Sequence, residues 1–127
     1  MKKGVLISRV LLGLIFFVFG LNGFLNFIPQ PPLPERMQTF MNGMMVTTYF
    51  FPLLKGTETI CGLLLLGNLF VPLTLVILAS ITINIFMVHA FMAPEGMPVA
   101  IVVLALHVFL MWAHRSAYQP MLRAKQP

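Results

Sequence analysis

The sequence predicts an all-α integral membrane protein, a four-helix transmembrane bundle with its N and C termini in the cytoplasm. Three observations predict this fold class. The chain of 127 residues is 59% hydrophobic and 9% charged, whereas a soluble domain carries about 25% charged residues. Long uncharged stretches alternate with breaks that contain proline. Lysines and arginines gather at the two chain ends, as they do on the cytoplasmic side of membrane proteins. The length suits one domain, residues 1–127.

The net charge of +5 does not indicate a nucleic-acid partner. The basic residues flank apolar runs, and no basic stripe with interleaved aromatic residues lies between them. A single cysteine, Cys61, excludes an intramolecular disulfide and a dithiol mechanism within this chain. We expect its partners to be the lipid bilayer, a protein partner or a second copy of the chain, and an amphipathic small molecule.

The first span is expected over residues 5–27. Lys2 and Lys3 ahead of an apolar run are also typical of a signal peptide. However, the uncharged stretch from Val10 to Ile28 is longer than the apolar core of such a peptide, which has about 7–15 residues. No small-residue cleavage motif follows it. We therefore interpret this segment as an uncleaved span.

Residues 29–45 are expected to form an outer loop. Four prolines between Pro29 and Pro34 prevent a helix there. The short, methionine-rich segment from residue 37 to 45 is expected to lie as an interfacial helix across the mouth of the bundle. The second span then follows over residues 46–69.

A stretch without Asp, Glu, Lys or Arg runs from Thr59 to Pro94. As one helix it would be roughly 54 Å long, whereas the hydrocarbon core is about 30 Å thick. The stretch must therefore fold back. Gly67 suits a helix C-terminus and Pro72 suits the first turn of the next helix, which predicts a tight hairpin.

The third and fourth spans are expected over residues 71–92 and 98–118, with a turn at residues 93–96. An even number of spans returns the chain to its starting side, so both termini share the cytoplasmic side. The loop with Glu35 and the turn with Glu95 should then face outward.

Six polar residues within these spans are candidates for a ligand-binding site. Ionisable side chains at hydrocarbon depth cost about 2.5–3.5 kcal/mol each on insertion scales, so their presence is informative. Their positions along the four spans fall into two layers, which predicts that they converge inside the bundle. They are Asn22, Lys55, Glu58, Asn84, His89 and His107.

Lys55 and Glu58 share one helical stripe with Thr59 and Gly62, so the two charges can pair. One interpretation is a structural pair that locks helix packing. Another is a site that binds a polar head group, with Glu58 as the candidate proton-handling residue. In a third, Lys55 reaches the interface and leaves Glu58 uncharged.

His89 and His107 allow two interpretations as well. A single membrane histidine is typically an interhelical hydrogen-bonding group, but either ring could bind a ligand or transfer a proton. No His and Cys spacing indicates haem or zinc, so no metal site is expected. Methionines of the outward half, together with His89, would suit copper(I), although adaptable packing explains them more simply.

Two segments carry a family resemblance. The segment from Arg9 to Phe24 resembles the first span of DoxX-like proteins, and Glu58 ahead of a Gly-Leu-rich run to Gly67 resembles their second-span signature. His89 near the end of the third span fits as well. The resemblance covers roughly residues 8–118 and implies a small four-helix protein of the bacterial inner membrane.

The resemblance also implies redox chemistry, because some DoxX-like proteins are subunits of thiosulfate:quinone oxidoreductases and others are tied to quinones or oxidative stress. We therefore expect an accessory or quinone-linked subunit whose intramembrane polar pocket binds a quinone or another amphipathic molecule. Lys55 would be the counter-charge of Glu58. No redox centre is visible in this chain, so a partner or a bound molecule must supply one. The alternatives are a non-enzymatic assembly factor that docks a partner, and proton-coupled transport of a small solute by an oligomer.

Overall fold

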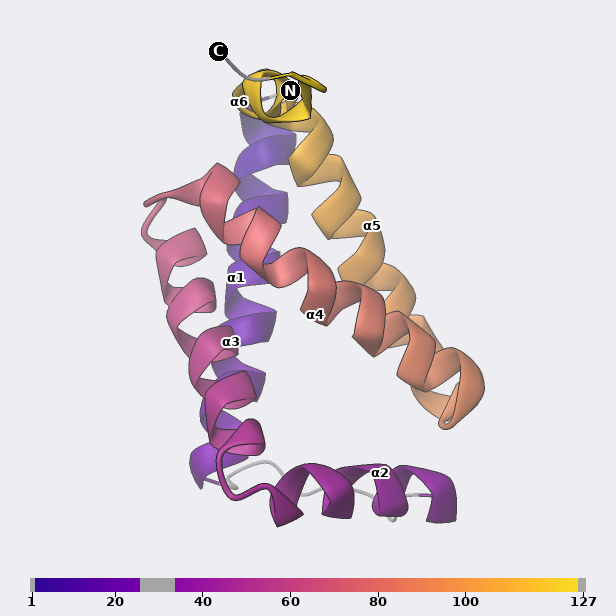
Figure 1. The fold of residues 1–127 in the computed structure, drawn as a ribbon. Helices are drawn as coiled ribbons and strands as arrows, with labels where there is room; N and C mark the ends of the chain where they lie inside the picture. Colours follow the sequence, from indigo (N-terminus) through magenta and orange to yellow (C-terminus); the bar gives the residue numbers. More distant parts are fainter. Residues whose placement is uncertain (1, 26–33, 126–127) are drawn as a thin grey trace.

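Two pairs of helices make up most of the fold (Figure 1). In the first pair, α1 (Lys2–Leu25) lies antiparallel to α3 (Phe50–Leu66). In the second pair, α4 (Val71–Phe91) lies beside α5 (Met97–Ala113). The remaining elements are α2 (Glu35–Val46), η1 (Pro94–Gly96), α6 (Arg115–Tyr118) and η2 (Gln119–Leu122).

This computed structural model describes residues 2–25 and 34–125, and every regular element within those ranges is a helix. The predicted all-α fold is therefore confirmed. The predicted proline-rich turn at residues 29–33 and the end of the first span at residues 26–27 lie outside the described residues.

Three helical stretches are long and apolar enough to cross a membrane: α1, α4 and the run Pro94–Ala113 formed by η1 and α5. The 17-residue α3 is long and apolar enough only when it is taken together with α2, from which it is bent by 96°. If that pair counts as one span, the bundle crosses the membrane four times. At 1.5 Å per residue α3 is about 25 Å long, close to the thickness of the hydrocarbon core.

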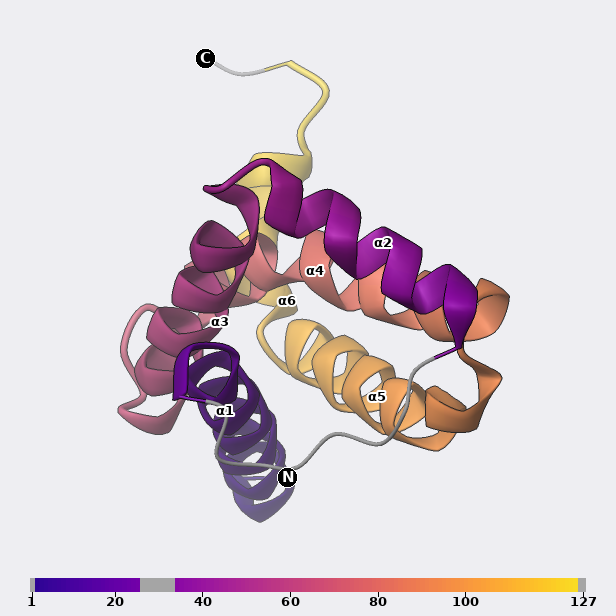
Figure 2. The ribbon, with the colours of Figure 1, turned by 90° about the horizontal axis from the view of Figure 1, so that it is seen from below.

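The two helix pairs meet at one end of the molecule and diverge toward the other (Figure 1). The start of α1 and the helix α6 both lie at the end where the pairs meet. At the wide end, α2 crosses from α3 toward the far end of α4 (Figure 2). The Arg36 guanidinium on α2 donates a hydrogen bond of 3.3 Å to the Phe91 carbonyl on α4. The wide end between α3 and α4 is therefore covered by α2.

Close contact between α1 and α3 depends on glycine. A Cβ atom added at Gly62 would overlap the Phe17 amide nitrogen and lie 2.7 Å from the Gly13 carbonyl oxygen. A Cβ atom at Gly20 would lie 2.7 Å from the Thr59 amide nitrogen. Small residues allow helix backbones to approach this closely inside membranes. Gly13 and Gly20, seven residues apart, therefore lie on the face of α1 that packs against α3.

Arg9 caps the end of α3. Its guanidinium donates hydrogen bonds to the carbonyl oxygens of Leu65 and Leu66, the latter at 3.2 Å. The last carbonyl groups of a helix lack partners within the helix, and they carry the negative end of its dipole. The half-buried cation of α1 is thus stabilised by the C-terminus of α3.

The hairpin predicted between the second and third spans is present. Gly67 is the C-cap residue of α3, and Pro72 lies in the first turn of α4. Asn68 and Phe70 adopt positive φ angles of 57° and 52°, which reverse the chain within a few residues. At the same end of the molecule, the Tyr118 hydroxyl donates to the Pro72 carbonyl at 2.8 Å.

Two helix limits differ from the expectation by four residues or more. The second span begins at Phe50 rather than at residue 46, because the chain turns sharply at Thr48, whose φ is 66°. The Phe50 amide then donates to the Thr47 hydroxyl at 2.9 Å. The fourth span ends at Ala113 rather than at Tyr118, since the helix breaks at His114 before the short helix α6.

Candidate ligand-binding site

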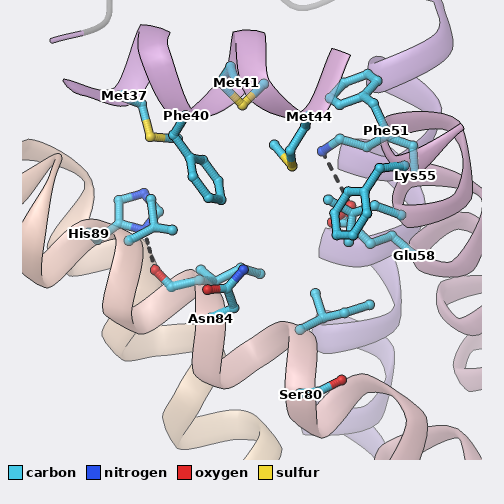
Figure 3. Close-up of a pocket in the computed structure, with 15 residues that line it drawn as sticks. Met37, Phe40, Met41, Met44, Phe51, Lys55, Glu58, Ser80, Asn84 and His89 are labelled. Carbon is cyan, nitrogen blue, oxygen red and sulfur yellow. Dashed lines mark hydrogen bonds and ion pairs between the residues drawn. The ribbon is translucent and has the colours of Figure 1, made fainter. Parts of the chain in front are cut away.

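Lys55 and Glu58 form an ion pair on the face of α3 that looks into the space between the helix pairs (Figure 3). Lys55 Nζ lies 3.3 Å from Glu58 Oε2, and Glu58 is only 4% exposed. The contact is an ion pair, and Oε2 accepts no hydrogen bond from the described part of the chain. Buried polar atoms nearly always have hydrogen-bond partners. Oε2 is therefore free to accept a hydrogen bond from a bound molecule.

Lys55 is held by its hydrocarbon stem as well as by its charge. A Cβ atom at Gly23 of α1 would lie 2.5 Å from Lys55 Cδ, so the stem lies directly on that backbone. Lys55 Nζ also lies 5.6 Å from the centre of the Phe51 ring, a cation–π distance. About 20% of the Lys55 side chain is exposed. The ammonium therefore stays beside Glu58 and faces the cavity.

Asn84 and His89 of α4 lie on the opposite wall (Figure 3). His89 Nδ1 lies 2.7 Å from the Ile85 carbonyl oxygen, which can only accept, so Nδ1 carries a proton. In the neutral ring, Nε2 is then a hydrogen-bond acceptor. A Cβ atom at Gly96 would lie 2.5 Å from Nε2, so the ring rests against the backbone of η1.

A cavity of about 360 Å³ separates these two walls, which is within the roughly 300–1,000 Å³ usual for small-molecule sites. Its remaining lining is mostly aliphatic, aromatic and thioether. The helix α2 closes it on one side, and four residues at helical spacing point inward from there (Figure 3). They are Met37, Phe40, Met41 and Met44.

This stripe of α2 lines the cavity, but its residues were not among the six candidates chosen from the sequence. The methionines were interpreted as packing residues or copper ligands. The spacing of residues 37, 40, 41 and 44, with polar residues between them, is the signal of an amphipathic helix. Residue spacing alone could not show that its apolar face covers the Lys55–Glu58 pair.

The other two candidate residues lie elsewhere. Asn22 is buried on α1 but is not among the residues that line the cavity. His107 is buried between α4 and α5, where Nε2 donates to the Leu75 carbonyl at 2.8 Å and Nδ1 accepts from the Thr82 hydroxyl at 2.7 Å. Both ring nitrogens are therefore occupied. Of the six candidates, the cavity brings together Lys55, Glu58, Asn84 and His89.

A protein-family model described as DoxX matches residues 4–90, more than half of the chain. The chain belongs to the DoxX family. The match includes Arg9 and both polar walls of the cavity, whereas His107 lies outside it. Neither the curated proteins nor the solved structures give a match to this DoxX protein. Family membership and the apolar helices together indicate a multi-pass membrane protein.

His107→Leu should lower the thermal stability of this DoxX protein without changing ligand binding. The substitution leaves the Thr82 hydroxyl and the Leu75 carbonyl without their partner, and such bonds contribute about 0.6–2 kcal/mol in membranes. The melting temperature in detergent measures this loss. The double variant Thr82→Val/His107→Leu should recover part of it, because the unpaired hydroxyl is gone. Equal melting temperatures of His107→Leu and the unmodified protein would show that the hydrogen bonds of His107 between α5 and α4 do not stabilise the fold.

Proposed function

We propose that this DoxX protein binds an amphipathic molecule of the quinone class in the cavity around Glu58. It would serve as an accessory, quinone-linked subunit in redox or oxidative-stress metabolism of the bacterial inner membrane. The observation that carries the proposal is the Lys55–Glu58 pair, whose carboxylate is buried and which faces Asn84 and His89 across a mostly apolar cavity. An ion pair with a free acceptor atom in such a place suits a polar head group.

The two walls offer both donors and acceptors. The Lys55 ammonium and the Asn84 amide can donate to carbonyl oxygens of a head group, one from each wall. Glu58 Oε2 and His89 Nε2 can accept from hydroxyl groups, again one from each wall. A bound quinone would supply two-electron redox chemistry, with electrons from a partner. Glu58 Oε2 and His89 Nε2 are then the atoms placed to take up or release its protons.

The rest of the cavity suits the apolar part of such a molecule. Methionine side chains are flexible and polarisable, so Met37, Met41 and Met44 can adapt to a ring of variable shape. The opposite face of α2 carries exposed Gln38 and Asn42. The helix therefore separates the head-group site from the water at the membrane surface.

Glu58→Gln should reduce the quinone that copurifies with the protein by about tenfold or more, because the charged acceptor and its pairing with Lys55 are lost. The measurement is solvent extraction of the purified protein followed by mass spectrometry. Glu35→Gln, the same change on the exposed face of α2, is the matched control. If quinone content is unchanged in Glu58→Gln, or if wild-type protein carries none and binds none, the assignment is wrong. The assembly role would then be favoured.

A further inference from the structure

A second cavity, of about 310 Å³, meets the first at the polar centre. Lys55, Glu58, Ile85 and His89 line both cavities, so the two adjoin at this polar centre. The second cavity extends between α1 and α5 instead of toward α2. Beyond the shared residues and the Gly96 backbone, its walls are hydrocarbon and aromatic. Those walls are formed by Ile15, Phe16, Phe19, Val99 and Val103.

This second cavity runs from the bundle interior to the lipid-facing surface. At its inner part, Phe16 and Val103 are buried. At its outer part, Phe19 and Val99 are exposed, Val99 by 51%. The described residues thus outline a path that starts at a charged pair and ends at the hydrocarbon of the bilayer.

We propose that this path between α1 and α5 holds the hydrocarbon tail of the ligand, while its head group lies at Glu58. The inference rests on the proposed function and assigns a shape to the substrate: one polar ring with a single long chain. The path matters for access more than for affinity, because lipid is as apolar as the cavity wall. A tailed head group can reach Glu58 only if its chain has a way out to the bilayer.

Two other ways out fit less well. Past α2, a hydrocarbon chain would meet the polar outer face of that helix. The gap between α3 and α4 contains a hollow that shares Phe50, Leu54, Ser80 and Ile81 with the first cavity, and its lining includes the hydroxyl residues Thr57 and Ser80. That hollow does not reach Lys55 or Glu58 themselves. Among the cavities lined by described residues, the path past Val99 is lined by the charged pair itself and leads to an apolar mouth without passing these hydroxyl groups.

The test compares Val99→Trp with Ile101→Trp in lipid nanodiscs. Both residues lie on α5 and both are 51% exposed, but only Val99 lines the path. The probes are dimethoxy-methyl-benzoquinone without a tail and the same quinone with a decyl chain. Val99→Trp should weaken binding of the decyl quinone by about tenfold or more and change the tail-less quinone by less than about twofold. Ile101→Trp should change neither.

A photoreactive diazirine at the end of the decyl chain gives a second readout on the unmodified protein. Crosslinks should map to peptides around Phe19 or Val99. Crosslinks at Leu53 or Ile77, which line the hollow between α3 and α4, would overturn the tail path. So would equal binding of the decyl quinone by both tryptophan variants. If the tail path fails but the tail-less quinone still binds in a way that depends on Glu58, the proposed function stands. If neither quinone binds, both the tail path and the proposed function are overturned.

Discussion

Lys55→Met should destabilise the protein strongly, because it leaves the Glu58 carboxylate buried without its counter-charge. Removal of one partner from a fully buried ion pair costs about 3–5 kcal/mol. Since a fifth of the Lys55 side chain is exposed, we expect the lower end of that range. Methionine keeps an unbranched stem against Gly23, so the lost stability results from the missing charge and not from altered packing.

The double variant Lys55→Met/Glu58→Gln is the matched control. It removes both charges, so it should recover most of the lost stability. Cys61 provides the measurement, because it is the only cysteine of the chain and is buried on α3. A thiol-reactive dye therefore becomes fluorescent when α3 leaves the bundle on heating. If the single and double variants melted at the same temperature, the two charges would not depend on each other.

Gly62→Ala should also have a large effect, through the contact between α1 and α3. The new methyl group would overlap the backbone of Phe17 and approach that of Gly13. Backbone atoms of a helix cannot move aside singly, so the two helices must separate. Overpacking of this kind costs about 1–3 kcal/mol, and it would loosen the helix that carries Lys55 and Glu58.

Gly56→Ala, on the same helix, is the control for Gly62→Ala. A Cβ atom at Gly56 meets nothing within 4 Å. Alanine is favoured over glycine in a helix by up to about 1 kcal/mol, so this variant should melt at the same temperature or higher. An equal fall for both variants in the Cys61 dye assay would contradict this account, because it would show that the loss at Gly62 does not depend on close packing against α1.

Much of the fold could be predicted because the bilayer restricts the choices. The uncharged run from Thr59 to Pro94 is too long for one span, and Gly67 and Pro72 mark where it must reverse. Lysines and arginines at both ends suggest an even number of spans. A helix across the mouth of the bundle was expected, but the start of α3 could not be predicted, because the turn at Thr48 depends on a positive φ angle that threonine rarely adopts.

The site was harder to predict than the fold. His89 and His107 look equivalent in the sequence, since each is a single histidine in an apolar helix. The structure separates them by their partners: His107 uses both ring nitrogens between α4 and α5, whereas His89 uses one within its own helix. Which face of a uniformly apolar helix turns toward its neighbour is set by side-chain packing between helices, and periodicity does not reveal it.

The most direct test of the binding site is an experimental structure of the protein in lipid nanodiscs with the decyl benzoquinone added. We expect density for the head group between Glu58 and His89, beneath the methionines of α2. Glu58→Gln under the same conditions should lose that density. A cavity closed by its own side chains, or a quinone bound only on the outer surface of the bundle, would contradict a ligand site at Glu58.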